Sequence, residues 1–328
     1  TKGDLVAQLV SKRLGTMYDT VSIQFAIQYM CGIDVLPTFL QNVATLIKPG
    51  GTFIGTYPCG AEIAKLLGKE SHFDNGFLKI TENTHGPGIQ FYADFSGDSK
   101  SYFDEFGTSQ EFPVSFPTII EILEPLGFVL VENKGFCDTQ EFNRYILTAP
   151  EKQFSGVFKT FVFQKRELTA FFPPAHGINW DSLKIDKVGK FSITRPRDAA
   201  VLHKAIRDFV DSDTHTVCDG TACVGGDTIH FSSAFREVFA WEVDTERFRA
   251  LKNNINIYGI KNVTTINGSI VNSTGECDLL YLDPPWGGPD YKNNGAVELY
   301  LDGQNIKTLL VSLKKRFRQI AVKVPFNY

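Results

Sequence analysis

The strongest constraint on the fold is a short apolar run that two prolines bring to an end. Residues 279–282 are apolar or aromatic, and Asp283-Pro284-Pro285-Trp286 follows them directly. Proline has a fixed φ and no backbone N–H, so a strand inside a sheet cannot continue through this pair. A short apolar run bounded by such a turn is typical of a buried strand. We therefore predict a strand whose end presents Asp283 and Trp286.

An acidic and an aromatic side chain held by rigid prolines can bind the amino group of a nucleobase. The Asp283 carboxylate can accept hydrogen bonds from an exocyclic amine, and the Trp286 ring can stack on the base. This combination favours an enzyme that methylates an exocyclic base nitrogen, with Asp283, Pro284, Pro285 and Trp286 as catalytic residues. Two alternatives remain open: the four residues form only a turn between a strand and a helix, or Trp286 is a core aromatic residue.

Strand-like and helix-like segments alternate through the second half of the chain. Apolar residues recur at helical spacing in Pro196–Val210, and proline suits the first turn of a helix. We predict helices at 196–210, 227–235 and 245–258, and strands at 215–218, 238–243, 263–267, 279–282 and 320–324. This order is typical of an α/β fold with a doubly wound, Rossmann-like parallel sheet.

A turn suited to a cofactor follows the first of these strands. Residues 219–226, Asp-Gly-Thr-Ala-Cys-Val-Gly-Gly, lie between a predicted strand and a predicted helix. Small residues let the backbone approach a ligand, and a helix start offers free N–H groups. Glu242 ends the next strand, where a carboxylate can accept both hydroxyls of a ribose. The alternative is that Glu242 is a solvent-exposed acid at a strand end.

Size and composition exclude several classes of protein. A chain of 328 residues with 43% hydrophobic residues is long enough for two packed domains. It has no run of about 18 apolar residues, so no membrane span is predicted. The net charge of −4 argues against a strongly basic nucleic-acid coat. Six cysteines without a Cys-x-x-Cys pair favour buried, reduced thiols over a disulfide scaffold or a metal site.

The first half contains a second α/β series. We predict strands at 20–25, 52–56, 128–133 and 158–164, helices at 36–46 and 119–126, and a turn at Lys48-Pro49-Gly50-Gly51. The regular pattern lapses near 166–180, which predicts two domains, 1–165 and 181–328, joined by a linker.

Several segments of the second half together resemble a known family. They are 191–194, 217–227, 241–244, 253–259 and the extended motif 283–291, Asp-Pro-Pro-Trp-Gly-Gly-Pro-Asp-Tyr. Over about 180–328 the chain is similar to the trimethylguanosine synthases, the RNA cap guanine-N2 methyltransferases. The resemblance implies that S-adenosylmethionine binds at Thr194, Asp219, Thr221, Gly225 and Glu242, with Asp219 near the methionine amine. It also implies that Trp286 stacks on the purine. Family members usually have an aspartate where this chain has Ser269, whose hydroxyl would contact the adenine amine.

The first half resembles a second cap enzyme. Residues 22–29, 46–56 and 111–117 are similar to the mRNA cap guanine-N7 methyltransferases over about 3–165. The resemblance implies that Gln28, Tyr29 and Glu111 bind the guanine, and the family has histidine where this chain has Gln28. The family's glycine-rich cofactor turn precedes the strand at Thr20, so we expect both domains to be incomplete at the chain ends, as part of a longer capping protein.

Three functions are consistent with these observations. The first is S-adenosylmethionine-dependent methylation of the RNA cap guanine, at N7 by the first half and at N2 by the second. The second is adenine-N6 methylation of nucleic acid, and the third is a non-catalytic subunit that supports a capping enzyme. We expect capped RNA and other capping domains as partners, and neither a membrane nor a metal. Two joined methyltransferases would suit a large DNA virus that caps its transcripts in the cytoplasm.

Overall fold

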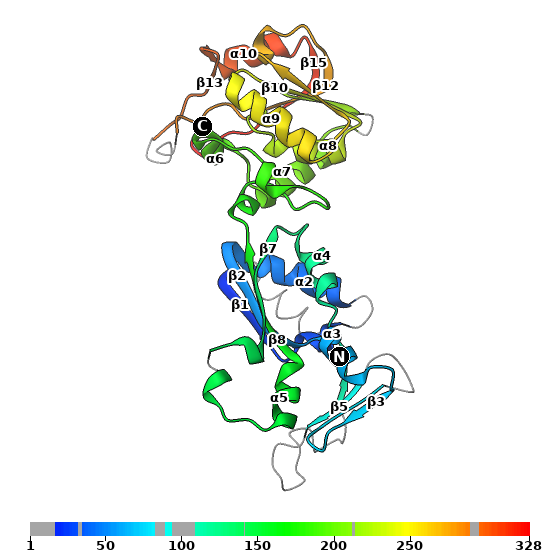
Figure 1. Cartoon of the computed structure of the whole chain (residues 1–328). Coiled ribbons are helices and arrows are strands. Elements are labelled where there is room, and N and C mark those ends of the chain that lie inside the picture. Colours follow the sequence, from blue (N-terminus) through cyan, green and yellow to red (C-terminus); the bar gives the residue numbers. More distant parts are fainter. Residues whose placement is uncertain are drawn as a thin grey trace. The chain divides into compact units, whose positions relative to one another are not determined.

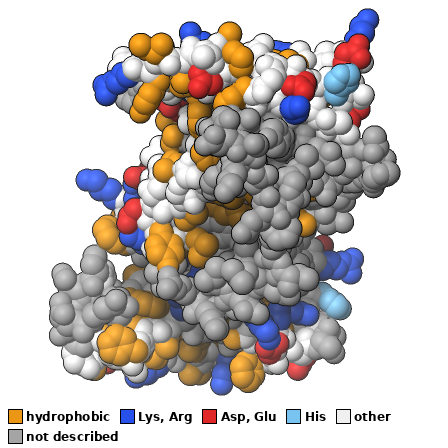
Figure 2. Space-filling view, turned by 90° about the horizontal axis from the view of Figure 1, so that it is seen from below, with side chains coloured by type: hydrophobic (Ala, Val, Ile, Leu, Met, Phe, Trp, Pro, Cys, Tyr) orange, Lys and Arg blue, Asp and Glu red, His pale blue; other side chains and the backbone are white. Residues whose placement is uncertain are grey.

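The chain forms two compact units, residues 1–167 and 168–328. The computed structural model describes residues 17–31, 35–82, 89–93, 109–140, 142–211, 214–288 and 295–328. Each unit is an α/β structure with its own sheet and core (Figure 1). No helix within these ranges is long and apolar enough to cross a membrane. Basic and acidic side chains are interspersed on the face shown in Figure 2, in keeping with the small net charge.

The second unit is built on a five-stranded, fully parallel sheet. Its order is β11-β10-β9-β12-β15, so the chain starts in the middle and winds outward in both directions. The strands are β9 (Thr216–Asp219), β10 (Glu237–Glu242), β11 (Val263–Asn267), β12 (Cys277–Leu282) and β15 (Phe317–Val322). This arrangement confirms the predicted Rossmann-like α/β fold, and β11 has the predicted bounds.

Helices cover both faces of this sheet (Figure 1). Side chains alternate between the faces of a strand. Val217 and Tyr281 therefore join the cluster with α7 and α8, while Leu280 and Leu282 join the cluster with α10. The helices are α6 (Lys187–Ser192), α7 (Pro196–Phe209), α8 (Gly226–Ala234), α9 (Thr245–Ile257) and α10 (Ile306–Leu313), and the short hairpin β13 (Tyr300–Leu301) and β14 (Gln304–Asn305) precedes α10.

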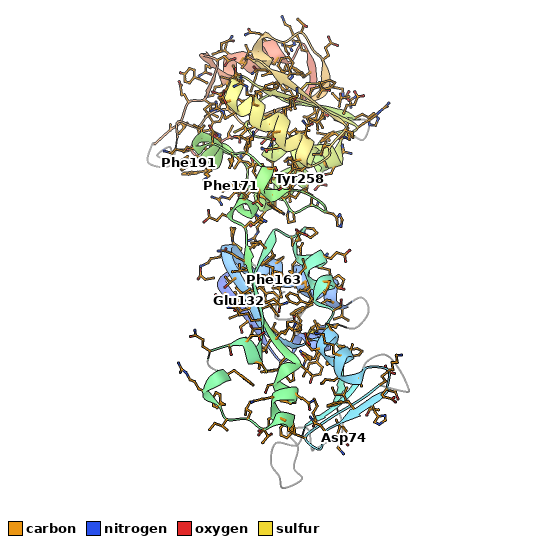
Figure 3. All side chains as sticks on the ribbon, viewed as in Figure 1. Asp74, Glu132, Phe163, Phe171, Phe191 and Tyr258 are labelled. Carbon is orange, nitrogen blue, oxygen red and sulfur yellow. A yellow bond between two sulfur atoms is a disulfide. The ribbon has the colours of Figure 1, made fainter. Side chains whose placement is uncertain are left out.

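The segment interpreted as a linker packs within the second unit. Phe172 and Trp180 are almost fully buried in the cluster that also contains residues of α9. The hydroxyl of Tyr258 donates a hydrogen bond to the Pro173 carbonyl at 2.6 Å. Figure 3 labels Phe171 and Tyr258 in this region, and both contact the same cluster.

The first unit combines a mixed sheet with a separate antiparallel one. In the sheet β1-β2-β8-β7, β1 and β2 are parallel and the remaining pairs are antiparallel. Its strands are β1 (Tyr18–Gln24), β2 (Ile47–Pro58), β7 (Phe128–Gly135) and β8 (Phe158–Lys165), and the antiparallel sheet comprises β3 (His72–Asp74), β4 (Leu78–Glu82), β5 (Ile89–Ala93) and β6 (Ser109–Glu111). The helices are α2 (Val35–Leu46), α3 (Gly60–Leu67), α4 (Phe116–Leu123) and α5 (Ala149–Gly156). The core packs α2 and α4 onto strand residues such as Phe53 and Phe163, the latter labelled in Figure 3.

Two sequence-based predictions are wrong. The predicted turn at 48–51 lies inside β2, where Gly50 has φ +82° and the register with β1 shifts. An irregular strand tolerates turn residues because the local ladder is already interrupted. The expectation of reduced thiols fails for Cys218 and Cys277, which form a disulfide between the neighbouring strands β9 and β12.

Candidate active site

A cavity of about 360 Å³ opens at the carboxyl ends of the central strands of the second unit. Ligands of open parallel sheets bind at this edge, where the strand order reverses. The lining residues from the predicted site are Thr194, Thr221, Glu242, Ser269, Asp283, Pro284, Pro285 and Trp286. The fold therefore brings together side chains that are up to 92 positions apart in the sequence, from Thr194 to Trp286.

Glu242 is a buried acid rather than the solvent-exposed alternative. It is 7% exposed at the end of β10. Its carboxylate accepts hydrogen bonds from the backbone N–H of Cys223 at 2.9 Å and of Asp244 at 2.8 Å. Arg247 lies 3.5 Å from the same carboxylate. Because a carboxylate offers about four acceptor positions, Glu242 is held in place with capacity left for ligand hydroxyls.

Asp219 and Gly225 shape the wall of the cavity and do not line it. The Thr228 hydroxyl donates to Asp219 Oδ2 at 2.6 Å, and the Thr221 N–H donates to Oδ1 at 3.3 Å. Gly225 caps α8 with φ +103°, a conformation that favours glycine. Gly220, Thr221 and Gly226 of the same turn line the cavity instead.

Burial, and then the nearby Asp227 carboxylate, raise the pKa of Asp219 to about 8. An acid whose pKa is higher in the folded state stabilises the fold at low pH, and this contribution is lost as the pH rises through the folded-state value. We expect the melting temperature of Asp219→Asn to rise by a few degrees relative to the native chain as the pH increases from about 4 to about 8. The exposed Asp208→Asn is the control, and a pH-independent difference for Asp219→Asn would contradict the assignment.

Asp283, Trp286 and Lys323 also line the cavity. The Asp283 N–H donates to the Thr221 hydroxyl at 2.7 Å, which ties the Asp-Pro-Pro-Trp segment to the glycine turn. Lys323 Nζ donates to Asp283 Oδ2 at 2.6 Å and lies 5.3 Å from the centre of the Trp286 ring. Trp286 is partly buried, with its ring packed against the α10 cluster and lining the cavity.

A buried network of hydrogen bonds around Asp227 holds Thr194 of the cavity lining in place. Thr194 donates to Asp227 Oδ2 at 2.6 Å, the Tyr281 hydroxyl donates to the same oxygen at 3.2 Å, and His203 Nε2 lies 3.2 Å from Oδ1. Burial opposes ionisation of Asp227, but hydrogen bonds from His203 and Thr194 hold its pKa below the usual value. Asp227 is therefore a buried carboxylate that fixes Thr194 at the cavity edge.

Ser269 lines the cavity but uses its hydroxyl locally. The hydroxyl accepts a hydrogen bond from the Val271 N–H at 3.1 Å and so begins the short 3-10 helix Ile270–Asn272. Trp241 and the exposed Phe191 of α6, labelled in Figure 3, also line the cavity. Trp241 and Phe191 therefore give this part of the cavity an apolar surface, and Ser269 adds a hydroxyl group to it.

The predicted residues of the first unit are only partly described. Gln28 and Tyr29 lie on the 3-10 helix Ile27–Met30. Gln28 is 5% exposed, and its Nε2 donates to the Phe25 carbonyl at 2.9 Å. Tyr29 is 39% exposed. Glu111 ends β6, and its side chain is not among those that the structure describes, so the three residues are not shown to share a site. The end of the extended motif, 289–291, also lies outside the described residues.

Sequence reasoning missed Lys323, Asp227 and His203. Lys323 follows the last strand, 40 positions after Asp283, and no local pattern links the two. His203 and Asp227 are 24 positions apart on α7 and α8. The one signal that the sequence offered is the position of Asp227 in the first turn of the predicted helix 227–235.

The parallel sheet, the glycine turn, the buried acid at the end of β10 and the Asp-Pro-Pro-Trp segment together define a class I methyltransferase fold. The chain belongs to the mRNA (guanine-N(7))-methyltransferase domain family, whose model matches residues 1–167. Residues 214–327 match the model of the RNA cap guanine-N2 methyltransferases. Both resemblances proposed from the sequence are thus confirmed, and both families make S-adenosylmethionine the expected cofactor.

Several curated relatives each match a little over a third of this chain. A protein of Acanthamoeba polyphaga mimivirus, uncharacterized protein L320, is 32% identical over 119 residues, 34% of this chain and 46% of that protein. The trimethylguanosine synthase of Schizosaccharomyces pombe is 27% identical over 128 residues, 36% of this chain and 52% of that enzyme. The mRNA cap guanine-N(7) methyltransferase of Caenorhabditis elegans is 32% identical over 125 residues, 37% of this chain and 33% of that enzyme. The chain thus spans about half or less of the length of these relatives.

Among solved structures, an rRNA methylase from Streptococcus thermophilus aligns with a TM-score of 0.28 and 17% identity, over 40% of this chain and 72% of that chain. An S-adenosylmethionine-dependent methyltransferase from Clostridium acetobutylicum aligns with a TM-score of 0.30 and 13% identity, over 47% of this chain and 61% of that chain.

Proposed function

We propose that the chain is an S-adenosylmethionine-dependent RNA cap methyltransferase whose second unit modifies the guanine N2 amine. The observation that carries this proposal is that Asp283, Lys323 and Trp286 lie close together in the cavity that the glycine turn also lines. An acceptor for an amine and a ring for a purine thus stand beside a turn suited to a cofactor.

The residues of this cavity fit S-adenosylmethionine. Its volume of about 360 Å³ suits a nucleoside-sized ligand. Glu242 would hold the ribose hydroxyls, the backbone of Gly220 and Thr221 would lie along the methionine part, and Ser269 and Trp241 would contact the adenine. When bound, the cofactor supplies a methyl group that is already electrophilic at carbon.

The protein's own residues then need only to position the acceptor amine and exclude water. Asp283 would accept a hydrogen bond from the guanine N2 amine and so orient its lone pair. Trp286 would stack on the purine, more strongly when N7-methylation gives the base a positive charge. Pro284, which is buried, and Pro285 fix the distance between these two groups.

A transfer assay tests this proposal. The purified chain is incubated with S-adenosylmethionine carrying a labelled methyl group and, separately, with N7-methylguanosine diphosphate, guanosine diphosphate and an adenine oligonucleotide. We expect label at N2 of the N7-methylguanine substrate. Label at adenine N6 would support the alternative, a nucleic-acid methyltransferase. The extended motif, and the match of residues 214–327 to the guanine-N2 family, argue against that result. Binding of neither cofactor nor cap nucleotide would support a non-catalytic subunit.

For the first unit, we propose that Gln28, Tyr29 and Glu111 contribute to a cap guanine site of the N7 type. The residues 1–167 family match supports this assignment. Capped RNA would be the shared substrate of both units, and the mimivirus relative supports a viral origin. A viral capping protein of this kind would act in the cytoplasm.

A further inference from the structure

Lys323 stands at the junction of three groups of the cavity wall. It directly follows β15, and its N–H donates to the Leu282 carbonyl at 2.8 Å, which places it level with the end of β12. Its ammonium group donates to Asp283 Oδ2 at 2.6 Å and to the Thr194 hydroxyl at 2.8 Å. The same group lies 5.3 Å from the centre of the Trp286 ring.

This position is braced, because both partners of the ammonium are themselves held. Thr194 is fixed by its bond to Asp227, and Asp283 is fixed by its backbone bond to Thr221. The side chains of Lys323 and Asp283 are 23% and 14% exposed, so water replaces little of their interaction. Moving the ammonium away would break two hydrogen bonds and leave a largely buried carboxylate without its cation.

The ion pair of Lys323 and Asp283 also determines which hydrogen-bonding edge of a base the cavity can recognise. A carboxylate only accepts hydrogen bonds, whereas a protonated carboxyl group also donates one. Lys323 occupies Oδ2, and a carboxylate with about four acceptor positions retains capacity for an amine. An ionised Asp283 therefore selects a base edge that carries an N–H donor, such as the guanine N2 amine.

Several charged or titratable groups surround Asp283. The nearest are Lys323 after β15, Asp227 on α8, Asp219 on β9 and Tyr281 on β12. His203 of α7 contacts Asp227, and Glu242, Arg247 and Asp302 line the same cavity. Burial raises the pKa of Asp283 to about 6, and Lys323 is the main group that opposes this rise. Asp227 acts in the same direction as burial. Of these neighbours, Lys323 is the one that holds the carboxylate ionised near neutral pH.

We propose that Lys323 is a positioning residue that keeps Asp283 an ionised, oriented acceptor and thereby makes the site selective for a base with an exocyclic amine. This inference rests on the proposed function of the same cavity. It assigns to Lys323 a role that acts through Asp283 and not through contact with the reacting nitrogen.

The test compares Lys323→Met and Lys323→Arg with the native chain and with the control Lys315→Met, an exposed lysine of the same unit. Methyl transfer to N7-methylguanosine diphosphate is measured from about pH 5.5 to pH 9. We expect Lys323→Met to lose about tenfold in kcat/KM near pH 6.5 and to recover most of it near pH 9, since one pKa unit corresponds to a factor of about ten. Lys323→Arg should keep the native acid limb, because it retains the cation.

Two further readouts do not depend on turnover. By calorimetry, the preference for N7-methylguanosine diphosphate over its inosine analogue, which lacks the amine, should fall about tenfold in Lys323→Met near pH 6.5. The melting temperature should fall relative to the native chain as the pH rises. A raised acid stabilises the fold only below its folded-state pKa, and removing Lys323 raises that pKa further.

Equal losses at every pH, an unchanged inosine preference, or the same effect in Lys315→Met would overturn the inference. If the native chain transfers no methyl group but the melting profile changes as expected, the pairing stands and the proposed function fails. If transfer occurs at N2 while Lys323→Met behaves as the native chain does, the function stands and the inference fails.

Discussion

Replacing Trp286 by alanine is expected to lower kcat/KM for N7-methylguanosine diphosphate by about 100-fold, at the upper end of the stacking range of about 1–3 kcal/mol per base. The ring lines the cavity together with Asp283, and among the aromatic residues that line the cavity it is the closest in sequence to the amine acceptor. Loss of the ring removes both the stacking and the orientation of the amine, so the effect should fall on kcat as well as on KM. Initial rates over a range of nucleotide concentrations measure both.

Two variants serve as controls for this result. Trp286→Phe retains an aromatic face and should keep most of the activity, whereas Phe209→Ala removes an 86% exposed ring of α7 and should change nothing. Because Trp286 also packs against the α10 cluster, melting temperatures show whether the alanine variant is folded. Undiminished turnover by folded Trp286→Ala would reject the stacking role.

Removal of the Asp283 carboxylate is expected to lower the rate of methyl transfer about as much as Trp286→Ala does, and to lower the stability of the fold more. Asp283→Ala leaves the Lys323 ammonium, 23% exposed on its side chain, without its carboxylate partner. Breaking a largely buried ion pair by removing one partner costs about 3 kcal/mol. Transfer should fall by about 100-fold or more, because a hydrogen bond to a charged group contributes about 1.5–3 kcal/mol in addition to its orienting role.

Asp283→Asn separates charge from shape. The amide keeps one oxygen acceptor but cannot ionise, so its activity should lose the acid limb that the native Asp283 produces as the pH falls through about 6. Chemical denaturation measures the free energy of unfolding of both Asp283 variants. Glu276→Gln, which removes the charge of an exposed acid, is the matched control. An Asp283→Asn variant with the native pH profile would show that another group is responsible for the acid limb.

The parts of the fold that follow from local rules could be predicted from the sequence. The apolar run before two prolines and the glycine turn before a helix fix their own backbone conformations, and β12 and α8 lie where these patterns place them. The Lys48–Gly51 segment shows the limit, because β2 continues through these turn-forming residues although its ladder with β1 passes from Ile47 directly to Thr52. The antiparallel sheet of the first unit was not predicted, because its strands are only three or five residues long and offer too short a pattern.

The site shows the same division. Thr221 and Asp283 could be proposed because each follows a predicted strand, and Glu242 because it lies at the end of one, at the same edge of the sheet. The orientation of Asp219 could not, since the Thr228 hydroxyl, nine positions later, competes with the cavity for its carboxylate. The contact of Lys323 with Asp283 could not be predicted, because it depends on β12 and β15 being neighbours in the folded sheet.

In the proposed function, one cavity of the second unit holds a guanine amine against Asp283 beside the glycine turn. The most direct test is a crystal structure of the chain with S-adenosylhomocysteine and N7-methylguanosine diphosphate. The account predicts the purine parallel to the Trp286 ring, its N2 within hydrogen-bond distance of Asp283, and the cofactor ribose on Glu242. A nucleotide bound with N2 turned away from Asp283, or a cofactor outside this cavity, would contradict it.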